Sequence, residues 1–444
     1  MQKEKKSIIL FSVLSSLLIA NFFIFSALAQ AQSSSSLKSE IEQLKKEISD
    51  LKKQTSEQNQ SLIDEVALLK TTKDIPALGT EDQTQSQMGL AASKVYYSNA
   101  KVSIGGYGEA VYKDDRRQGQ ANTTDLYRFV PYIGYRFNDW IVLNSELEFE
   151  HGGADEGSGE AAVEFMYLDF LLHPAANIRV GNYLIPVGLT NLKHEPTYFG
   201  SVYRPLVETN IIPSTWHENG ILVYGNASED FSYQAGIFAS PLATEASTST
   251  ANFSNSSWIR GGRQSGAQAK AEDFSGVIRL DYSGLPFSNI GASFIYGDSS
   301  QDVSGLSNLT YTLWEVHAES RWKGFDWNAL YTQGTLAGAG ELISTNPIGE
   351  TVEGWYTTFS YDLMQLCSDT TYQLPVFIRY SEYDTNKDVP TGQTRNKSLS
   401  KKVTTVGINY KPHSQVVLKA DFQSIDTEAG YEKDLLSLGM GFVF

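Results

Sequence analysis

Residues 434–444, which read DLLSLGMGFVF, decide the fold class of this chain. Every second position carries a large apolar side chain, and these are Leu436, Leu438, Met440, Phe442 and Phe444. A period of two places alternate side chains on opposite faces of a β-strand. The segment is therefore predicted to be a strand with one apolar face, and it ends on an aromatic residue.

The composition fits a β-barrel that separates lipid from an aqueous interior. The 444 residues include 24 Tyr, 22 Phe, 7 Trp and 36 Gly, and the mean hydropathy is −0.27. A helical membrane protein needs runs of about 20 apolar residues, and the one run of nearly this length is at the N-terminus. An apolar-faced strand that ends on Phe resembles the last strand of outer-membrane β-barrels, whose outward side chains meet lipid.

Residues 1–29 are predicted to be a secretory signal peptide, with cleavage near 29–31. Lys3, Lys5 and Lys6 precede an apolar stretch over 8–25, and small residues at signal-peptidase spacing follow. A retained membrane anchor is the alternative interpretation. The implied location is the outer membrane of a bacterium with two membranes.

Residues 37–70 are predicted to form a periplasmic coiled coil. Apolar residues repeat at heptad spacing, with Leu37, Leu44 and Leu51 in one position and Ile41 and Ile48 in the other. A single solvated amphipathic helix is the alternative. Ile and Leu in this arrangement favour two strands, whereas porins are commonly trimers, and we expect the larger barrel interface to decide for a homotrimer. Residues 71–99 are polar, contain Pro76 and Gly79, and are predicted to be a linker.

Residues 100–444 are predicted to be an all-β, antiparallel transmembrane barrel of about sixteen strands. The predicted strands are 101–112, 125–137, 140–151, 161–172, 177–186, 219–225, 231–239, 271–282, 289–297, 309–322, 325–334, 352–363, 374–384, 401–411, 415–425 and 434–444. Short and long connections alternate, as periplasmic turns and external loops do. A soluble two-sheet sandwich fits poorly, because every strand has an apolar outward face.

Two further expectations concern the barrel interior. Sixteen strands leave an aqueous channel unless something plugs it, and the coiled coil and linker are interpreted as too small to be a plug. Residues 165–172 are apolar on both faces, so we expect either an inserted loop that covers the inner face or a β-bulge.

The segment 177–189, NIRVGNYLIPVGL, resembles a motif of the phosphate-selective porin O/P family. The matching positions are Arg179, Gly181, Tyr183, Pro186, Gly188 and Leu189. The upstream EFMYLDFLL fits the same family, and the resemblance covers roughly residues 100–444. It implies an outer-membrane porin whose third external loop folds into the barrel, with Lys193 and Arg204 as candidates for the constriction. The alternative is that both are ordinary exposed loop charges.

The inward-facing positions of the predicted strands carry charges of both signs. These pore-lining candidates are Arg128, Arg136, Glu146, Glu148, Glu150, Arg179, Arg279, Glu315, Glu319, Arg321, Asp362 and Arg379. Turn geometry predicts that Arg128 lies opposite Glu150. Facing rows of opposite charge would create a transverse field that acts on dipolar solutes and ions, or would only keep a wet lumen soluble. The mixture differs from the basic ladder of phosphate-selective porins, so their solute is not transferred to this chain.

The predicted function is a passive channel for ions and small hydrophilic solutes, with a preference for anions as one option. The alternative is a structural tether in which the coiled coil contacts the cell wall or a periplasmic partner. The net charge of −16 argues against nucleic-acid binding. One cysteine, Cys367, excludes an internal disulfide. The six histidines suggest no catalytic site, and the pair His194 and Glu195 lacks a second ligand at zinc spacing, so neither an enzyme, a cofactor nor a metal site is expected.

Overall fold

A computed structural model describes residues 42–58, 60, 84–117, 119–153, 159–307, 309–367 and 371–444. The chain divides into two units, residues 1–74 and 75–444. In the first unit, residues 42–58 form an α-helix with exposed side chains, which agrees with the helical part of the coiled-coil prediction. Pairing of this helix stays a prediction. The predicted signal peptide and residues 61–70 lie outside the described residues.

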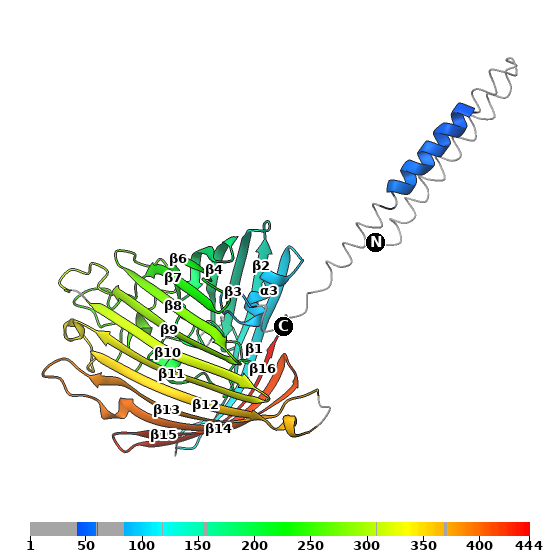
Figure 1. Cartoon of the computed structure of the whole chain (residues 1–444). Coiled ribbons are helices and arrows are strands. Elements are labelled where there is room, and N and C mark those ends of the chain that lie inside the picture. The colour runs from blue at the N-terminus through cyan, green and yellow to red at the C-terminus, as the bar shows by residue number, and fades with distance from the viewer. Residues whose placement is uncertain are drawn as a thin grey trace, which may run out of the picture. The chain divides into compact units, whose positions relative to one another are not determined.

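The second unit contains a closed antiparallel barrel of sixteen strands, in which each strand pairs with its neighbours in sequence and β1 pairs with β16 (Figure 1). The strands are β1 (Val102–Asp115), β2 (Thr123–Arg136), β3 (Ile141–Glu150), β4 (Glu160–His173), β5 (Ala176–Leu184), β6 (His217–Asn226), β7 (Phe231–Ala239), β8 (Phe274–Leu285), β9 (Ser288–Asp298), β10 (Thr310–Trp322), β11 (Phe325–Leu336), β12 (Thr351–Asp362), β13 (Pro375–Asp388), β14 (Ser400–His413), β15 (Val416–Thr427) and β16 (Glu432–Val443). This confirms the predicted fold class.

The strand prediction agrees with the structure in number, order and pairing. Each predicted strand overlaps one observed strand, and no end differs by more than four residues. Arg128 lies opposite Glu150, as the turn geometry predicts. In β4 the register shifts where Glu146 and Leu147 pair with Phe165 and Val163, so Glu164 lies in a β-bulge.

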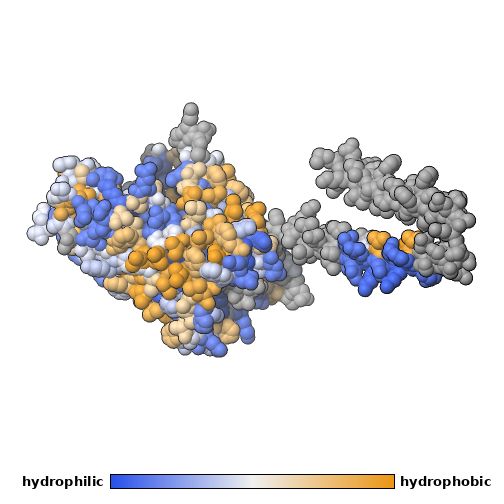
Figure 2. Space-filling view, turned by 90° about the horizontal axis from the view of Figure 1, so that it is seen from above, coloured by the Kyte–Doolittle hydropathy of each residue, from blue (hydrophilic) through white to orange (hydrophobic). Residues whose placement is uncertain are grey.

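The outward face of the barrel is apolar. Along β9, for example, Ile290, Phe294 and Tyr296 are exposed, while the alternating Ser293 and Ile295 are buried. Figure 2 shows hydrophobic residues gathered on the side of the barrel. Burying one such side chain is worth about 1.5–3 kcal/mol, so rows of them in contact with water would be unfavourable. Among the described residues, we find no helix with the length and hydropathy needed to cross a membrane.

The interior of the barrel is occupied by polypeptide. Loop 3 (residues 185–216) joins β5 to β6, and loop 4 (residues 240–273) joins β7 to β8. Both contribute fully buried aromatic residues, Trp216 from loop 3 and Trp258 from loop 4. The helix α3 (Leu90–Tyr97) packs against β1, β2 and β3. The inserted third loop was expected from the family resemblance, whereas loop 4 and α3, which lies within the predicted linker, were not expected inside the barrel.

The predicted linker is wrong in its second half, because residues 84–99, here called the strap, fold against the inner wall. Met88 and all five residues from Ala91 to Val95 of α3 are buried. A Cβ at Gly134 of β2 would lie 2.5 Å from the Val95 side chain, so only glycine leaves room for α3 there. The strap includes no run of large apolar residues, which is why it resembles a linker in the sequence.

Candidate pore constriction

Loop 3 begins with a tight turn held by a buried carboxylate. Gly188 has φ of +73°, a backbone region that favours glycine, and a Cβ there would meet the Glu208 carboxylate at 2.4 Å. Glu208 accepts hydrogen bonds from the backbone N–H of Leu189 at 2.8 Å and of Thr190 at 2.7 Å. Tyr356 of β12 donates its hydroxyl to the same carboxylate. These bonds direct loop 3 into the barrel.

Loop 3 then crosses the barrel and is bonded to the opposite wall. Arg379 of β13 donates to the Ser201 hydroxyl at 2.6 Å. Lys419 of β15 donates to the backbone oxygens of Phe199 and Ser201, both at 2.8 Å. Near its start, the loop is held by Arg279 of β8, which donates to the Gly188 carbonyl at 2.6 Å. Contacts with β8, β13 and β15 show that the loop narrows the lumen across its width.

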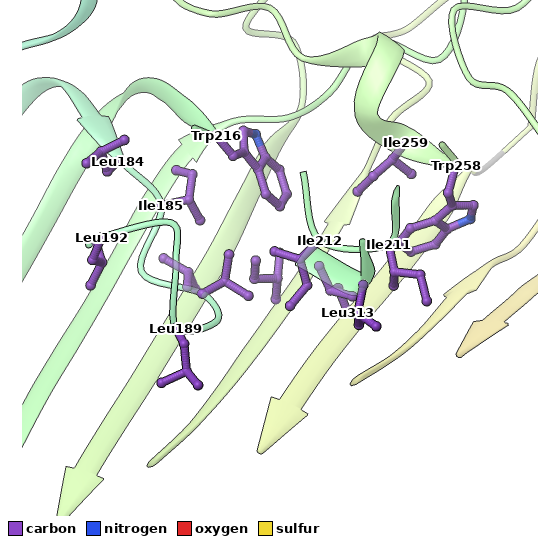
Figure 3. Packing of buried hydrophobic residues seen from close by; sticks show 14 of the residues in the cluster. Leu184, Ile185, Leu189, Leu192, Ile211, Ile212, Trp216, Trp258, Ile259 and Leu313 are labelled. Carbon is purple, nitrogen blue, oxygen red and sulfur yellow. The ribbon is translucent and has the colours of Figure 1, made fainter. Parts of the chain in front are cut away.

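Loops 3 and 4 share a hydrophobic cluster inside the barrel. Figure 3 shows Ile211 and Ile212 of loop 3 lying close to Leu313 of β10, with Trp258 and Ile259 of loop 4 nearby. The Trp258 indole N–H donates to the Gly349 carbonyl at 3.2 Å. A buried aromatic side chain removes about 150–250 Å² from water. The cluster therefore fixes both loops in place as a folded part of the constriction.

The predicted pore-lining arginines serve mainly to hold the interior segments. Arg136 donates to the Val95 carbonyl at the end of α3. Arg179 pairs with Asp169 and also donates to the Ser86 hydroxyl of the strap. Arg279 pairs with Asp281, and Arg379 binds loop 3 as described above. Each of these side chains therefore combines a place inside the barrel with a structural contact.

The predicted acidic residues divide into three groups by their contacts. Glu315 accepts from His317 at 2.8 Å, and Glu319 pairs with Lys193 of loop 3 at 3.5 Å. Next to Glu319 on the same strand, the predicted arginine Arg321 pairs with Asp326 in a more exposed position. Asp362 instead accepts hydrogen bonds from two backbone N–H groups of the following turn, so its role is to cap that turn.

The remaining acidic residues form the negative side of a charge array. Arg128 pairs with Glu150 at 3.0 Å and with Glu148 and Glu109 at 3.8 Å. Glu146 and Glu164 are buried next to this group. The cationic side of the array comes from the loops, because Arg204 interacts electrostatically with Glu146, Glu148 and Glu164. Charges of opposite sign therefore face each other between the β3–β4 wall and loop 3, and the transverse field itself stays a prediction.

Four members of this array, Glu109, Glu164, Arg260 and Arg263, were not predicted from the sequence. Arg260 and Arg263 of loop 4 interact electrostatically with the same carboxylates, Arg260 with Glu150 and Arg263 with Glu164. Glu164 is in the bulge, which turns it inward although its position in the alternation points outward. The sequence contains no signal for the fold of loop 4. For Glu164 there was a partial signal, because a β-bulge was one of the two options predicted for residues 165–172, which directly follow it.

The two predicted constriction residues are both in loop 3. Lys193 pairs with Glu319 and lies 5.0 Å from the ring centre of Tyr198. Arg204 is buried and donates to the His194 carbonyl at 3.3 Å. Burial, together with the charge of Arg204, lowers the pKa of the neighbouring His194. Burial raises the pKa of Glu195, although Glu195 accepts hydrogen bonds from the first turn of α3.

Comparison with solved structures finds a similar fold in an outer-membrane channel. The outer membrane channel DcaP of Acinetobacter baumannii has a TM-score of 0.51 and 11% identity, over 77% of this chain and 97% of that chain. Salmonella typhi OmpF, in complex with daunomycin, has a TM-score of 0.48 and 10% identity, over 77% and 97%. The DcaP match shows a shared fold. No protein-family model matches the chain, so membership of the phosphate-selective porin family stays a prediction.

One relative is similar in sequence as well. A protein of Aquifex aeolicus (strain VF5), described as an uncharacterized protein, is 35% identical over 372 residues. The match covers 80% of this chain and 83% of the relative. At this identity and coverage, the chain belongs to the family of the Aquifex aeolicus protein.

Proposed function

We propose that this protein is an outer-membrane channel that passes ions and small hydrophilic solutes through a constriction made by loop 3, loop 4 and the strap. The observation that carries the proposal is the charge array of Arg128, Arg204 and the carboxylates on β3 and β4, enclosed in a barrel with an apolar outer face. Buried charge is costly, and a water-filled pathway beside the array would reduce that cost.

The likeness to DcaP, which is described as an outer membrane channel, supports both the location and the channel function. Because three chain segments occupy the interior, we expect a narrower pathway than an empty sixteen-strand barrel would have. We further propose a homotrimer, by analogy with porins. Transport would need no cofactor and no chemical step.

The proposal is tested by single-channel recording of the purified mature protein in planar bilayers. Discrete openings in steps are expected, and the reversal potential in a salt gradient would give the ion preference. A barrel shown to be folded by its heat-dependent shift in electrophoretic mobility, but without openings, would contradict the proposal.

Charge reversal in loop 3 is expected to change ion selectivity. Arg204→Glu places a carboxylate next to Glu146, Glu148 and Glu164, so the reversal potential should shift towards cations. Lys193→Glu should shift it in the same direction but less, because Lys193 is paired with Glu319. Unchanged reversal potentials for both variants would show that Lys193 and Arg204 do not line the ion pathway. Lys270→Glu, in an exposed ion pair of loop 4, is the matched control.

The tether is a second candidate, and one observation favours it. The strap is the first described segment that follows the N-terminal unit in the chain, and it is bonded to β3 and β5, so a force on the predicted coiled coil would be transmitted to the barrel. Deleting residues 37–70 should then weaken attachment of the envelope layers and leave permeability intact. Normal envelope integrity in the deletion strain would contradict the tether.

A further inference from the structure

We propose that Glu146, Glu164 and His194 form a binding site for a divalent transition metal, with zinc as the best-fitting ion. Each residue offers one ligand atom, and these three atoms lie within 4.8 Å of one another. Glu146 comes from β3, Glu164 from the bulge of β4, and His194 from loop 3. The sequence analysis predicted no metal site. It missed this one because Glu146, Glu164 and His194 are far apart in the chain and do not form a spacing motif.

The imidazole is oriented as a metal ligand. Nδ1 of His194 lies 3.0 Å from the carbonyl oxygen of Asn191, and a carbonyl can only accept, so Nδ1 carries the proton. Nε2 then carries a lone pair, which lies 3.1 Å from the Glu146 carboxylate and 3.3 Å from the Tyr132 hydroxyl. Histidines that bind metals usually donate their other N–H to such a backbone carbonyl. A lone pair opposite a carboxylate oxygen is unfavourable unless a proton or a cation lies between them.

The carboxylates are incompletely satisfied. Glu146 and Glu164 are buried, with exposed fractions of 0% and 2%. One oxygen of each, Oε2, has no hydrogen-bond partner among the described residues. Buried polar atoms almost always have a partner, and exceptions need an explanation. Two unpartnered carboxylate oxygens beside an imidazole nitrogen, whose neutral neighbour is the Tyr132 hydroxyl, are explained by a shared cation.

The donor set and the local charge select the class of ion. One imidazole nitrogen and two carboxylate oxygens match zinc sites with three protein ligands, with bonds of about 2.0–2.2 Å. Ligands at this bond length are roughly 3–3.5 Å apart in a tetrahedron, close to the observed separation of Nε2 and the Glu146 oxygen. Arg204 and Arg263 place positive charge near these carboxylates, whereas Glu148 and Glu195 add two more carboxylates, so carboxylates outnumber the arginines and the surroundings still favour a cation.

A bound metal would join the barrel wall to loop 3. Two ligands belong to neighbouring strands, and the third belongs to the loop that narrows the lumen. The site would therefore act as a clamp on the constriction. This consequence is separate from channel activity, and metal binding can be measured in a barrel that conducts nothing.

The test is zinc binding by the full mature chain, folded in detergent, treated with EDTA and then dialysed against Zn²⁺. We expect one zinc per chain by mass spectrometry of the metal. X-ray absorption of the wild-type protein should show one nitrogen and at least two oxygen donors. Glu164→Gln and His194→Gln should weaken binding by at least tenfold, because the loss of even an indirect partner of a metal site costs about 10–100-fold.

The matched control is His317→Gln. His317 is also buried between two carboxylates, Glu315 and Asp281, but Arg279 already pairs with Asp281, so that cluster has its counter-charge. Zinc binding should be unchanged in this variant. The proposal is overturned if wild-type protein binds no zinc, if folded Glu164→Gln and His194→Gln both retain it, or if His317→Gln removes it. Mobility shift and circular dichroism would verify folding of every variant.

Discussion

Deleting residues 84–97 is expected to raise the single-channel conductance several-fold, if the protein conducts as proposed. The deleted segment contains most of the strap and all of α3. Asn144 of β3 binds the Ala92 carbonyl of the helix at 2.7 Å. At the other end of the strap, Gln87 binds Ser232 of β7 at 3.2 Å. The strap therefore lies along the inner wall from β3 to β7, and its removal should widen the pathway.

The matched control is deletion of residues 37–70, which shortens the same N-terminal part of the chain but leaves the strap. Its conductance should equal that of the wild type. A second variant avoids a deletion: Gly134→Leu would place a side chain where Val95 packs, and should displace α3 with a similar rise in conductance. If all three proteins conduct equally, the strap does not limit the pathway, and loops 3 and 4 alone make the constriction.

The strands were predictable from the sequence because each one shows a two-residue period between apolar and polar side chains. In β10, for instance, exposed Val316 alternates with buried Glu315 and His317. The contrast is strong because the outward side chains are apolar and many inward side chains are charged. The pairing is simple because each strand is antiparallel to the strands that precede and follow it in the sequence. Pairing of Arg128 with Glu150 followed from the short turn between β2 and β3 alone.

The interior was less predictable, because it depends on contacts between residues far apart in the chain. The strap is held by side chains such as Arg136 and Asn144, whose partners are backbone atoms that leave no pattern in the sequence. The resemblance to a porin family implied an inserted third loop, and loop 3 does enter the barrel. Nothing comparable indicated loop 4, whose Trp258 contributes to the same hydrophobic cluster.

In the candidate site, too, one property could be predicted from the sequence and another could not. Inward-facing charges were identified from strand alternation, but their partners were not. Glu146 was predicted to line a pore, whereas its contacts with His194 and Glu164 depend on a bulge and on the path of loop 3. Arg179 was assigned from a motif, and its partner Asp169 is ten residues upstream on the adjacent strand. Alternation gives the face of a residue, and only the folded chain gives its neighbours.

Arg179→Met is expected to lower the free energy of unfolding by about 3–5 kcal/mol, the cost of leaving a buried charge without its partner. Arg179 and Asp169 both have 0% exposed side chains, and two hydrogen bonds of 2.8 and 2.9 Å join them. Tyr167 also packs on the guanidinium, 4.0 Å from its ring centre. Methionine keeps some of the volume but removes the positive charge and the donors. Equilibrium unfolding in denaturant, with the protein in lipid vesicles, measures the loss.

The control has the same chemistry at a more exposed position. Arg321 donates to Asp326 at 2.8 Å, and both side chains are 38% exposed. Exposed ion pairs are worth at most about 1 kcal/mol, so Arg321→Met should have a small effect. Adding Asp169→Asn to Arg179→Met removes the unpaired charge and should restore part of the lost stability. A loss below about 1 kcal/mol in Arg179→Met would contradict the prediction, and the pair would then not hold the strap by charge.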